Sequence, residues 1–321
     1  MVIGLGSMGK RRIRLIKQID EKIEIIGVDS NIERCKETEG KFNITTSQNM
    51  NAVDSVNCAF ICTSPLSHSK IINTCLTKGW NVFTELNLVS DMYEENLTLA
   101  NEKNVVLFLS STFLYRDEVC YISDEVKASG SKVNYTYHIG QYLPDWHPWE
   151  SYKNFFVGDK RSNGCREIMA IELPWITNVF GKVIKYHVIS DRLTKLDIDY
   201  PDCFMIQLEH ESGTKGMLTV DIVSRKAVRN LEIFGEDLYL SWDGSPKGLY
   251  KYNIASKENE NISLYESVDK YEGYSAFIIE NAYRKEIETF FSQIKQGIKA
   301  KYGIKQDKEV LALIDSIEGI R

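Results

Sequence analysis

The chain of 321 residues has only seven cysteines, and their spacing matches neither a metal site nor a disulfide framework. Cys58 and Cys62 flank the apolar residues 59–61, where strand alternation places both thiols on the same face of a buried strand. Small buried thiols of this kind are typical of a reducing compartment. The sequence therefore predicts neither a metal centre nor disulfide bonds.

Long apolar runs and excess positive charge are absent as well. No stretch approaches the roughly 20 apolar residues that a membrane-spanning helix needs, and the start lacks the charged-then-apolar pattern of a signal peptide. The formal net charge is -6, whereas binding to nucleic acid depends on clustered Lys and Arg. We therefore expect a cytoplasmic protein whose partners are neither membranes nor nucleic acids.

One dense basic run, Lys10-Arg11-Arg12 with Arg14 beyond it, stands near the N-terminus. The apolar residues among 13–16 indicate that this run belongs to a helix. A basic run on a helix usually lies on the solvated face, and contact with a phosphate is the alternative.

The rest of the composition is that of a globular chain, with 43% hydrophobic and 26% charged residues, and the length suggests two domains. In the first half, short apolar strands alternate with helix-length segments, which predicts parallel crossovers and a doubly wound α/β sheet. The expected strands are residues 1–3, 23–28, 59–62, 81–84 and 105–109, and the expected helices cover 13–16, the stretch from 32, 67–78 and 93–102. Residues 1–3 are short for a central strand, so we expect that its beginning is missing.

The second half has a different pattern. A helix at 118–128 is followed by longer alternating runs, which predict an α+β domain with an open, mostly antiparallel sheet. These runs are residues 132–139, 183–189, 204–209, 216–223, 228–234 and 238–242, and helices at 274–294 and 307–317 follow. We expect a Rossmann domain at 1–117 and an α+β domain at 118–321, with the C-terminal helices packing back on the first domain as a further option.

Residues 4–9, GLGSMG, match the pattern G-x-G-x-x-G between an apolar strand and a helix. In this pattern Gly4 permits the tight turn, Gly6 lets the backbone approach a pyrophosphate, and Gly9 allows close packing of helix and strand. The helix N-terminus attracts negative charge. Asp29 ends the next strand at close to the spacing of about 20 residues that a dinucleotide site requires.

The carboxylate of Asp29 is suited to accept hydrogen bonds from the adenosine ribose and would repel a 2'-phosphate, which favours NAD over NADP. Arg34 nearby leaves NADP possible. The competing interpretation is that Asp29-Ser30-Asn31 only caps the next helix.

The chain resembles the glucose-fructose oxidoreductase, inositol dehydrogenase and rhizopine catabolism (Gfo/Idh/MocA) family over nearly its whole length. The resemblance rests on residues 4–12, 63–68, 140–152 and 231–236. It implies hydride transfer at a sugar-like hydroxyl or carbonyl, and a homodimer or homotetramer formed through the C-terminal sheet. The cofactor-binding residues that the fingerprint and the resemblance imply are Gly4, Gly6, Ser7, Met8, Gly9, Asp29, Ser30, Arg34, Thr63, Ser64, His68 and Glu85. For His68, the start of a helix satisfied by local backbone is an equal alternative.

The sequence departs from this family at two places. Where the family has Glu-Lys-Pro, this chain has Glu85-Leu86-Asn87, and leucine has no proton to give to the reacting oxygen. Counting back from residues 180–181, the family's catalytic histidine is replaced by Ile171 and a nearby acid by Pro174. These changes predict altered acid-base machinery.

His147 is the candidate base, because its ordinary pKa lies near neutrality and aromatic residues surround it; a packed or interface histidine is the alternative. The candidate substrate contacts are Tyr142, Trp146, Trp149, Arg166 and Glu167. The sequence predicts an NAD(P)-dependent oxidoreductase acting on a sugar, sugar phosphate or nucleotide sugar. The alternative is a catalytically silent dinucleotide-binding protein that acts as a sensor or as the partner of another enzyme.

Overall fold

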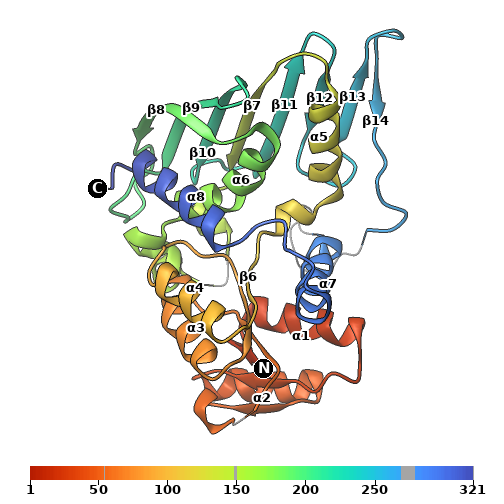
Figure 1. Cartoon of the computed structure of the whole chain (residues 1–321). Coiled ribbons are helices and arrows are strands. Elements are labelled where there is room, and N and C mark those ends of the chain that lie inside the picture. Colours follow the sequence, from red (N-terminus) through yellow and green to blue (C-terminus); the bar gives the residue numbers. More distant parts are fainter. Residues whose placement is uncertain (54, 148–149, 269–278, 321) are drawn as a thin grey trace. The chain divides into compact units, whose positions relative to one another are not determined.

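The computed structural model describes residues 1–53, 55–147, 150–268 and 279–320, and the chain forms two compact units (Figure 1). Unit 1 contains Met1–Thr112 and Tyr283–Leu311, and unit 2 contains Phe113–Ala282 and Ala312–Arg321. The boundary predicted at residues 117 and 118 concerns domains that fold independently, and it stays a prediction.

Unit 1 is built on a six-stranded parallel sheet with the strand order β3-β2-β1-β4-β5-β6. The order reverses between β1 and β4, as in a doubly wound Rossmann sheet, so the predicted fold class is confirmed for this part. The strands are β1 (Val2–Ile3), β2 (Ile26–Val28), β3 (Thr45–Ser47), β4 (Cys58–Ile61), β5 (Asn81–Thr84) and β6 (Leu107–Leu109). The sequence did not predict β3, because this edge strand contains no apolar residue.

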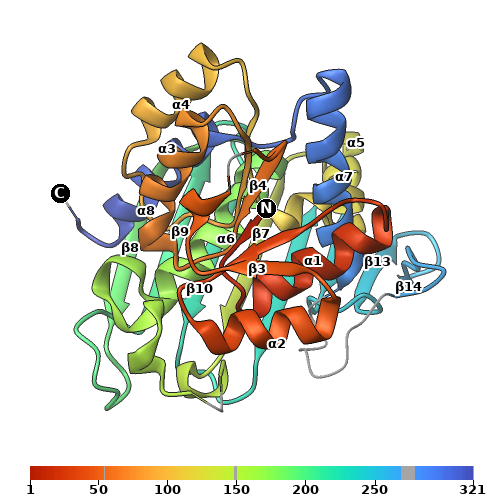
Figure 2. The same ribbon diagram turned by 90° about the horizontal axis from the view of Figure 1, so that it is seen from below.

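Helices cover both faces of this sheet. On one face α3 (His68–Thr77) and α4 (Tyr93–Glu102) pack together, and α1 (Ser7–Ile19) lies beside α2 (Ile32–Phe42) elsewhere in the unit (Figure 2). α7 (Glu280–Gln296) from Tyr283 onward and α8 (Ile304–Ile317) up to Leu311 also belong to unit 1. The helix expected at 274–294 falls partly outside the described residues, and within them it begins at Glu280.

Alternation along the strands divides the core of unit 1 into two layers. In β4, Ala59 and Ile61 join the cluster that contains Leu76 of α3. Phe60 points the other way and stacks on Phe83 with ring centroids 4.9 Å apart. A row of rings across β4, β5 and β6 receives Phe290 of α7, whose ring centroid lies 5.4 to 5.7 Å from theirs. These edge-on aromatic contacts hold α7 to the sheet of unit 1.

Unit 2 is built on an eight-stranded sheet with the order β14-β13-β12-β11-β7-β10-β9-β8. Only β7 and β10 pair in parallel, so the predicted mostly antiparallel sheet is confirmed. The strands are β7 (Val133–Gly140), β8 (Val183–Asp191), β9 (Cys203–His210), β10 (Lys215–Asp221), β11 (Val228–Gly235), β12 (Tyr239–Trp242), β13 (Leu249–Asn253) and β14 (Glu258–Asn261). β13 and β14 were not predicted. For β14 the reason is its all-polar sequence, ENEN.

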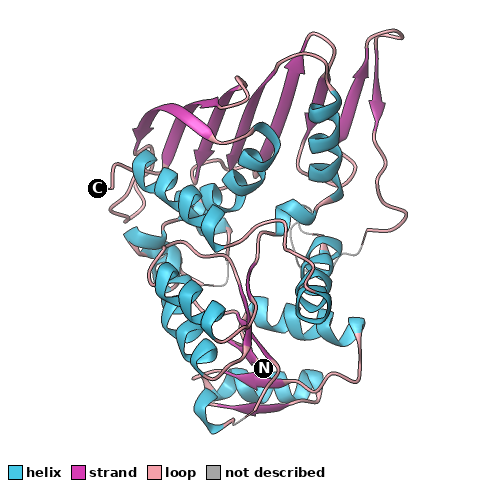
Figure 3. Cartoon of the chain, viewed as in Figure 1, coloured by secondary structure: helices cyan, strands magenta, loops and turns pink. Residues whose placement is uncertain are grey.

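Two helices, α5 (Asp117–Ala128) and α6 (Gly164–Phe180), lie on one face of this sheet (Figure 3). A buried carboxylate anchors α6 there: Glu172 accepts hydrogen bonds from the Tyr137 hydroxyl at 2.8 Å and the Trp175 indole at 2.7 Å. Its other oxygen pairs with Arg229 of β11 at 2.6 Å. The carboxylate thus joins α6 to β7 and β11.

We predict that Glu172→Ala lowers the free energy of unfolding by about 3–5 kcal/mol, because it removes the buried carboxylate that pairs with the Arg229 guanidinium, whose side chain is only 15% exposed. Chemical denaturation at neutral pH measures this loss. The matched variant Glu209→Ala breaks an exposed pair with Lys215 and should cost at most about 1 kcal/mol. Equal losses for the two variants would contradict the anchoring role of Glu172.

Candidate functional site

The glycine turn after β1 has a different steric reason for each glycine. Gly4 has a φ of +91°, and a Cβ there would lie 2.7 Å from the carbonyl atoms of Cys62. A Cβ on Gly9 would lie 1.9 Å from the carbonyl oxygen of Gly4. Gly6 differs, because a Cβ there would meet nothing within 4 Å. The first and third glycines are thus required by packing, and Gly6 exposes bare backbone to open space.

The N-terminus of α1 adjoins this open space. Gly6 occupies the N-cap position and has no side chain to cap the helix, and the first turn, which includes Ser7 and Met8, has no acidic residue. The partial positive charge of the helix end is therefore left for an external anion. An open cradle at Gly6 beside a helix N-terminus fits the pyrophosphate of a dinucleotide.

Asp29 lies at the end of β2 and is tied to the glycine turn. Its Oδ2 accepts a hydrogen bond from the Leu5 amide and its Oδ1 from the Asn31 amide, both at 2.8 Å. Asn31, and not Asp29, caps α2 through the amides of Glu33 and Arg34. Each carboxylate oxygen keeps a second lone pair that a ribose hydroxyl can use.

Two further residues follow Asp29 in the predicted cofactor set. Ser30 is exposed, and so is Arg34, whose Nη1 lies 3.8 Å from Asp29 Oδ2. This cation is close enough to offset part of the repulsion between Asp29 and a 2'-phosphate. Binding of NADP therefore stays open at this site.

His68 begins α3 and is buried. Its Nε2 lies 2.9 Å from the Thr63 carbonyl oxygen, which can only accept, so Nε2 carries the hydrogen. Its Nδ1 lies 2.8 Å from Asn87 Oδ1 and 3.3 Å from Thr84 Oγ1, and burial lowers the pKa of His68. These contacts fit the local structural role, and contact of His68 with a cofactor stays a prediction. Thr63 and Ser64 lie just after β4, at the carboxyl edge of the sheet where the strand order reverses.

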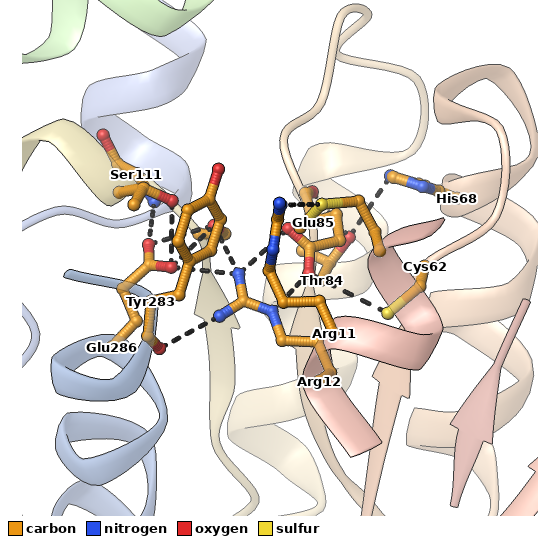
Figure 4. A network of polar contacts seen from close by, with 12 residues as sticks. Arg11, Arg12, Cys62, His68, Thr84, Glu85, Ser111, Tyr283 and Glu286 are labelled. Carbon is orange, nitrogen blue, oxygen red and sulfur yellow. Dashed lines mark hydrogen bonds and ion pairs between the residues drawn. The ribbon is translucent and has the colours of Figure 1, made fainter. Parts of the chain in front are cut away.

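Arg12 overturns the expectation that the basic run lies on a solvated face. Its side chain is fully buried and binds Glu85 through both oxygens, with Nε to Oε1 at 2.5 Å and Nη2 to Oε2 at 3.0 Å (Figure 4). Arg11 is buried as well. Arg12 follows Gly9 by three positions and precedes Ile16 by four, so it shares the buried face of α1. Helical spacing was the signal in the sequence that could have revealed this.

A second carboxylate, Glu286 of α7, meets the same guanidinium at 2.9 Å. It also accepts hydrogen bonds from Ser110 Oγ at 2.9 Å, the Ser111 amide at 2.7 Å and Thr112 Oγ1 at 3.0 Å. Burial raises the pKa of Glu286, and Arg12 opposes that shift. Burial alone would lower the pKa of Arg12. The two carboxylates outweigh this effect, so the pKa of Arg12 lies above its ordinary value. Sequence reasoning missed Glu286, which is distant in the chain.

The departures from the family pattern lie next to this cluster and in α6. Leu86 follows Glu85 and is partly buried, and Asn87 supplies the amide that holds His68. Ile171 lies within α6, where Pro174 is also accommodated. None of these side chains except Asn87 offers a polar atom.

The candidates from residues 140–152 lie in unit 2. The His147 ring stacks on Phe155 with centroids 4.6 Å apart, and burial lowers the pKa of His147. Trp146 donates from Nε1 to the Gln141 carbonyl at 3.0 Å. The Tyr142 ring carries the Arg225 guanidinium 3.6 Å from its centroid. Trp149 lies outside the described residues.

Arg166 and Glu167 are neighbours at the start of α6 with different surroundings. Arg166 is buried and pairs with Asp315 at 2.6 Å and with Glu318. Glu167 is half-buried as a residue, but its Oε2 is enclosed and has no hydrogen-bond partner among the described residues. Burial raises the pKa of Glu167 to about 8.

No group of three or more His, Cys, Asp or Glu side chains in the described part of the chain is arranged to hold a metal ion. Nor does that part contain a helix with the length and apolar character needed to cross a membrane.

Comparison with known proteins shows what this architecture resembles. Residues 1–111 match the oxidoreductase family with an NAD-binding Rossmann fold, Gfo/Idh/MocA. No curated protein matches the sequence.

Three solved structures are similar in fold. UDP-N-acetylglucosamine 3-dehydrogenase GnnA from Acidithiobacillus ferrooxidans has a TM-score of 0.77 at 16% identity, with 99% of this chain and 96% of that chain covered. Levoglucosan dehydrogenase, in complex with NADH and L-sorbose, has a TM-score of 0.80 at 14% identity, with 99% of this chain and 95% of that chain covered. An oxidoreductase from Agrobacterium radiobacter in complex with NAD+, L-tartaric acid and magnesium has a TM-score of 0.81 at 12% identity, with 99% of this chain and 94% of that chain covered.

Residues 1–111 thus match the model of the Gfo/Idh/MocA oxidoreductase family, which confirms for this part of the chain the resemblance seen in the sequence. Because this family domain is an NAD-binding Rossmann fold, the prediction of NAD as cofactor is confirmed too.

The Arg12 cluster predicts a pH-dependent stability defect. In Arg12→Met, two buried carboxylates lose their counter-charge, which should cost about 3–5 kcal/mol of unfolding free energy at pH 7. Burial raises the pKa of Glu286 and Arg12 opposes that shift, so without the guanidinium the folded-state pKa of Glu286 rises further above the unfolded value. Protonation of Glu286 then favours the folded state, and the defect shrinks as the pH falls. Urea denaturation at pH 7 and pH 5 measures this difference. Lys36→Met, which breaks an exposed pair, is the control, and a defect of equal size at both pH values would contradict the assignment.

Proposed function

We propose that this chain is an NAD-dependent oxidoreductase that transfers a hydride to or from a sugar, sugar phosphate or nucleotide sugar, with NADP as a second possible cofactor. The observation that carries the proposal is the open backbone at Gly6, between the N-terminus of α1 and the carboxylate of Asp29. The relatives' names, a nucleotide-sugar dehydrogenase and levoglucosan dehydrogenase, support a sugar-like substrate. We further propose a cytoplasmic location.

Each end of the cofactor would meet different residues of unit 1. Asp29, with Ser30 and Arg34, would hold the adenosine ribose, and the turn at Gly4, Gly6, Ser7, Met8 and Gly9 would hold the pyrophosphate. Thr63, Ser64, His68 and Glu85 follow β4 and β5, and they would line the nicotinamide half. When bound, the cofactor supplies hydride transfer, and the protein supplies orientation and proton transfer.

Proton transfer needs a group other than Leu86 and Ile171, since neither has a titratable side chain. Glu167 is the better-supported candidate, because a pKa of about 8 balances proton uptake and release near neutral pH. His147 is the alternative, although burial moves its pKa away from neutrality and its ring stacks on Phe155. Tyr142, Trp146, Trp149 and Arg166 remain proposed substrate contacts.

We also propose a homodimer or homotetramer formed through the sheet of unit 2. One face of this sheet exposes apolar side chains on β8, β9, β10 and β11, namely Ile189, Met205, Met217 and Phe234, which are between 40% and 61% exposed. Ile189 pairs directly with Met205, so these two side chains point to the same face, and the register of the other strands places Met217 and Phe234 there too. A second copy of the chain would cover this face.

The catalytic proposal is tested by titrating NAD+ and by following NADH formation on a panel of sugars, sugar phosphates and nucleotide sugars. For hydroxyl oxidation, kcat/KM should rise with pH and level off above about 8, because Glu167 must be ionised to accept the proton. Glu167→Gln should remove that limb and lower kcat by about 10²–10⁴-fold without changing NAD+ affinity.

His147→Gln is the matched control and should keep the limb. If the loss of kcat follows His147→Gln instead, His147 is the base. Binding of NAD+ without turnover on any substrate would favour the catalytically silent alternative.

The assembly is tested by size-exclusion chromatography with light scattering. Met205→Lys places a charge in the centre of the exposed face and should shift the protein to monomers. Ile254→Lys adds the same charge at a residue of equal exposure, 56% against 55%, between β13 and β14, and should leave the oligomer intact. A wild-type monomer would refute the proposed assembly.

A further inference from the structure

The cluster of Arg12, Glu85 and Glu286 has a role beyond holding unit 1 together. It contains one guanidinium and two carboxylates, and Figure 4 shows the guanidinium between them. Phe83 lies against the guanidinium at 4.5 Å and Tyr283 at 5.2 Å, so rings, and not water, surround the charges. Charges in such surroundings are weakly screened and act over several ångströms.

The same guanidinium binds both carboxylates, which is the arrangement of an ion pair. Glu286 also accepts hydrogen bonds from Ser110, Ser111 and Thr112, and these donors favour its ionised form. Glu85 uses both oxygens to accept from Arg12, in the two-fold geometry of a carboxylate bound to a guanidinium. One positive and two negative charges leave the cluster with one negative charge.

The strand order places this charge relative to the site. Asp29, at the end of β2, marks the adenosine side of the reversal between β1 and β4. The nicotinamide half of a dinucleotide therefore extends in the opposite direction, over the carboxyl ends of β4 and β5. Glu85 follows β5 directly, and its side chain is 12% exposed, whereas those of Arg12 and Glu286 are fully enclosed. Glu85 is thus the member of the cluster that faces the proposed site, and Arg12 and Glu286 lie behind it.

We propose that the negative charge which Glu85 and Glu286 carry beyond that of Arg12 makes the site prefer the oxidised over the reduced nicotinamide cofactor, with Glu286 as a positioning and charge-setting residue that does not touch the cofactor. The inference rests on the proposed function, because it requires a nicotinamide ring in the site. The ring carries a positive charge in NAD+ and none in NADH, so a nearby negative charge stabilises only the oxidised form. Removing one such charge behind the site should change the ratio of the two affinities on the order of tenfold.

The experiment measures the Kd of NAD+, NADH and ADP-ribose for the full chain and its variants by calorimetry. In Glu286→Gln, the ratio of the Kd of NAD+ to that of NADH should rise about tenfold. The Kd of ADP-ribose, which lacks the nicotinamide ring, should stay unchanged and thereby shows an intact site. Glu94→Gln removes one exposed carboxylate of the same unit, paired with Lys308, and should leave the ratio unchanged.

If Glu286→Gln no longer binds ADP-ribose, Glu85→Gln replaces it in the experiment. The ratio of the Kd of NAD+ to that of NADH should then rise in Glu85→Gln. An unchanged ratio in a variant that still binds ADP-ribose would overturn the inference and leave the proposed function standing. Failure of the wild-type chain to bind either form of the cofactor would overturn both.

Discussion

The close approach of backbone to backbone at the glycine turn is the constraint on which the rest of unit 1 depends. Gly4 leaves no room for a side chain beside Cys62, and Gly9 leaves none beside the Gly4 carbonyl. This contact sets α1 directly against β1 and β4, so the helix N-terminus opens where the strand order reverses. Once α1 is placed in this way, its buried face must accommodate Arg12, and Arg12 must be neutralised.

The ion-pair cluster is the consequence of that placement. A buried guanidinium is stable only with partners of opposite charge, and the chain supplies one from the end of β5 and one from α7. Ser110 and Ser111, which follow β6, then donate hydrogen bonds to Glu286. In this way a steric requirement in the first nine residues is connected to Glu286, 274 residues beyond Arg12, and a structural ion pair lies at the end of β5, where we propose the nicotinamide half of the cofactor.

The sequence predicted those parts of the fold that depend on local pattern. Local patterns located β5 and α4 at their observed bounds, and the glycine pattern with Asp29 indicated the dinucleotide site that we propose. It did not predict β3 or β14, which are polar edge strands defined by their neighbours and not by their own residues. Arg12 was misplaced because its charge was given more weight than its helical position. Glu286 and the enclosed oxygen of Glu167 depend on long-range packing, which no local pattern records.

The central claim is that the open backbone at Gly6 and the carboxylate of Asp29 together hold a dinucleotide. A crystal structure of the chain grown with NAD tests it most directly. Our account predicts the pyrophosphate against the amides at the start of α1, the adenosine ribose within hydrogen-bonding distance of Asp29, and the nicotinamide on the side of Glu85. A cofactor bound elsewhere, or bound here in the reverse direction, would contradict it.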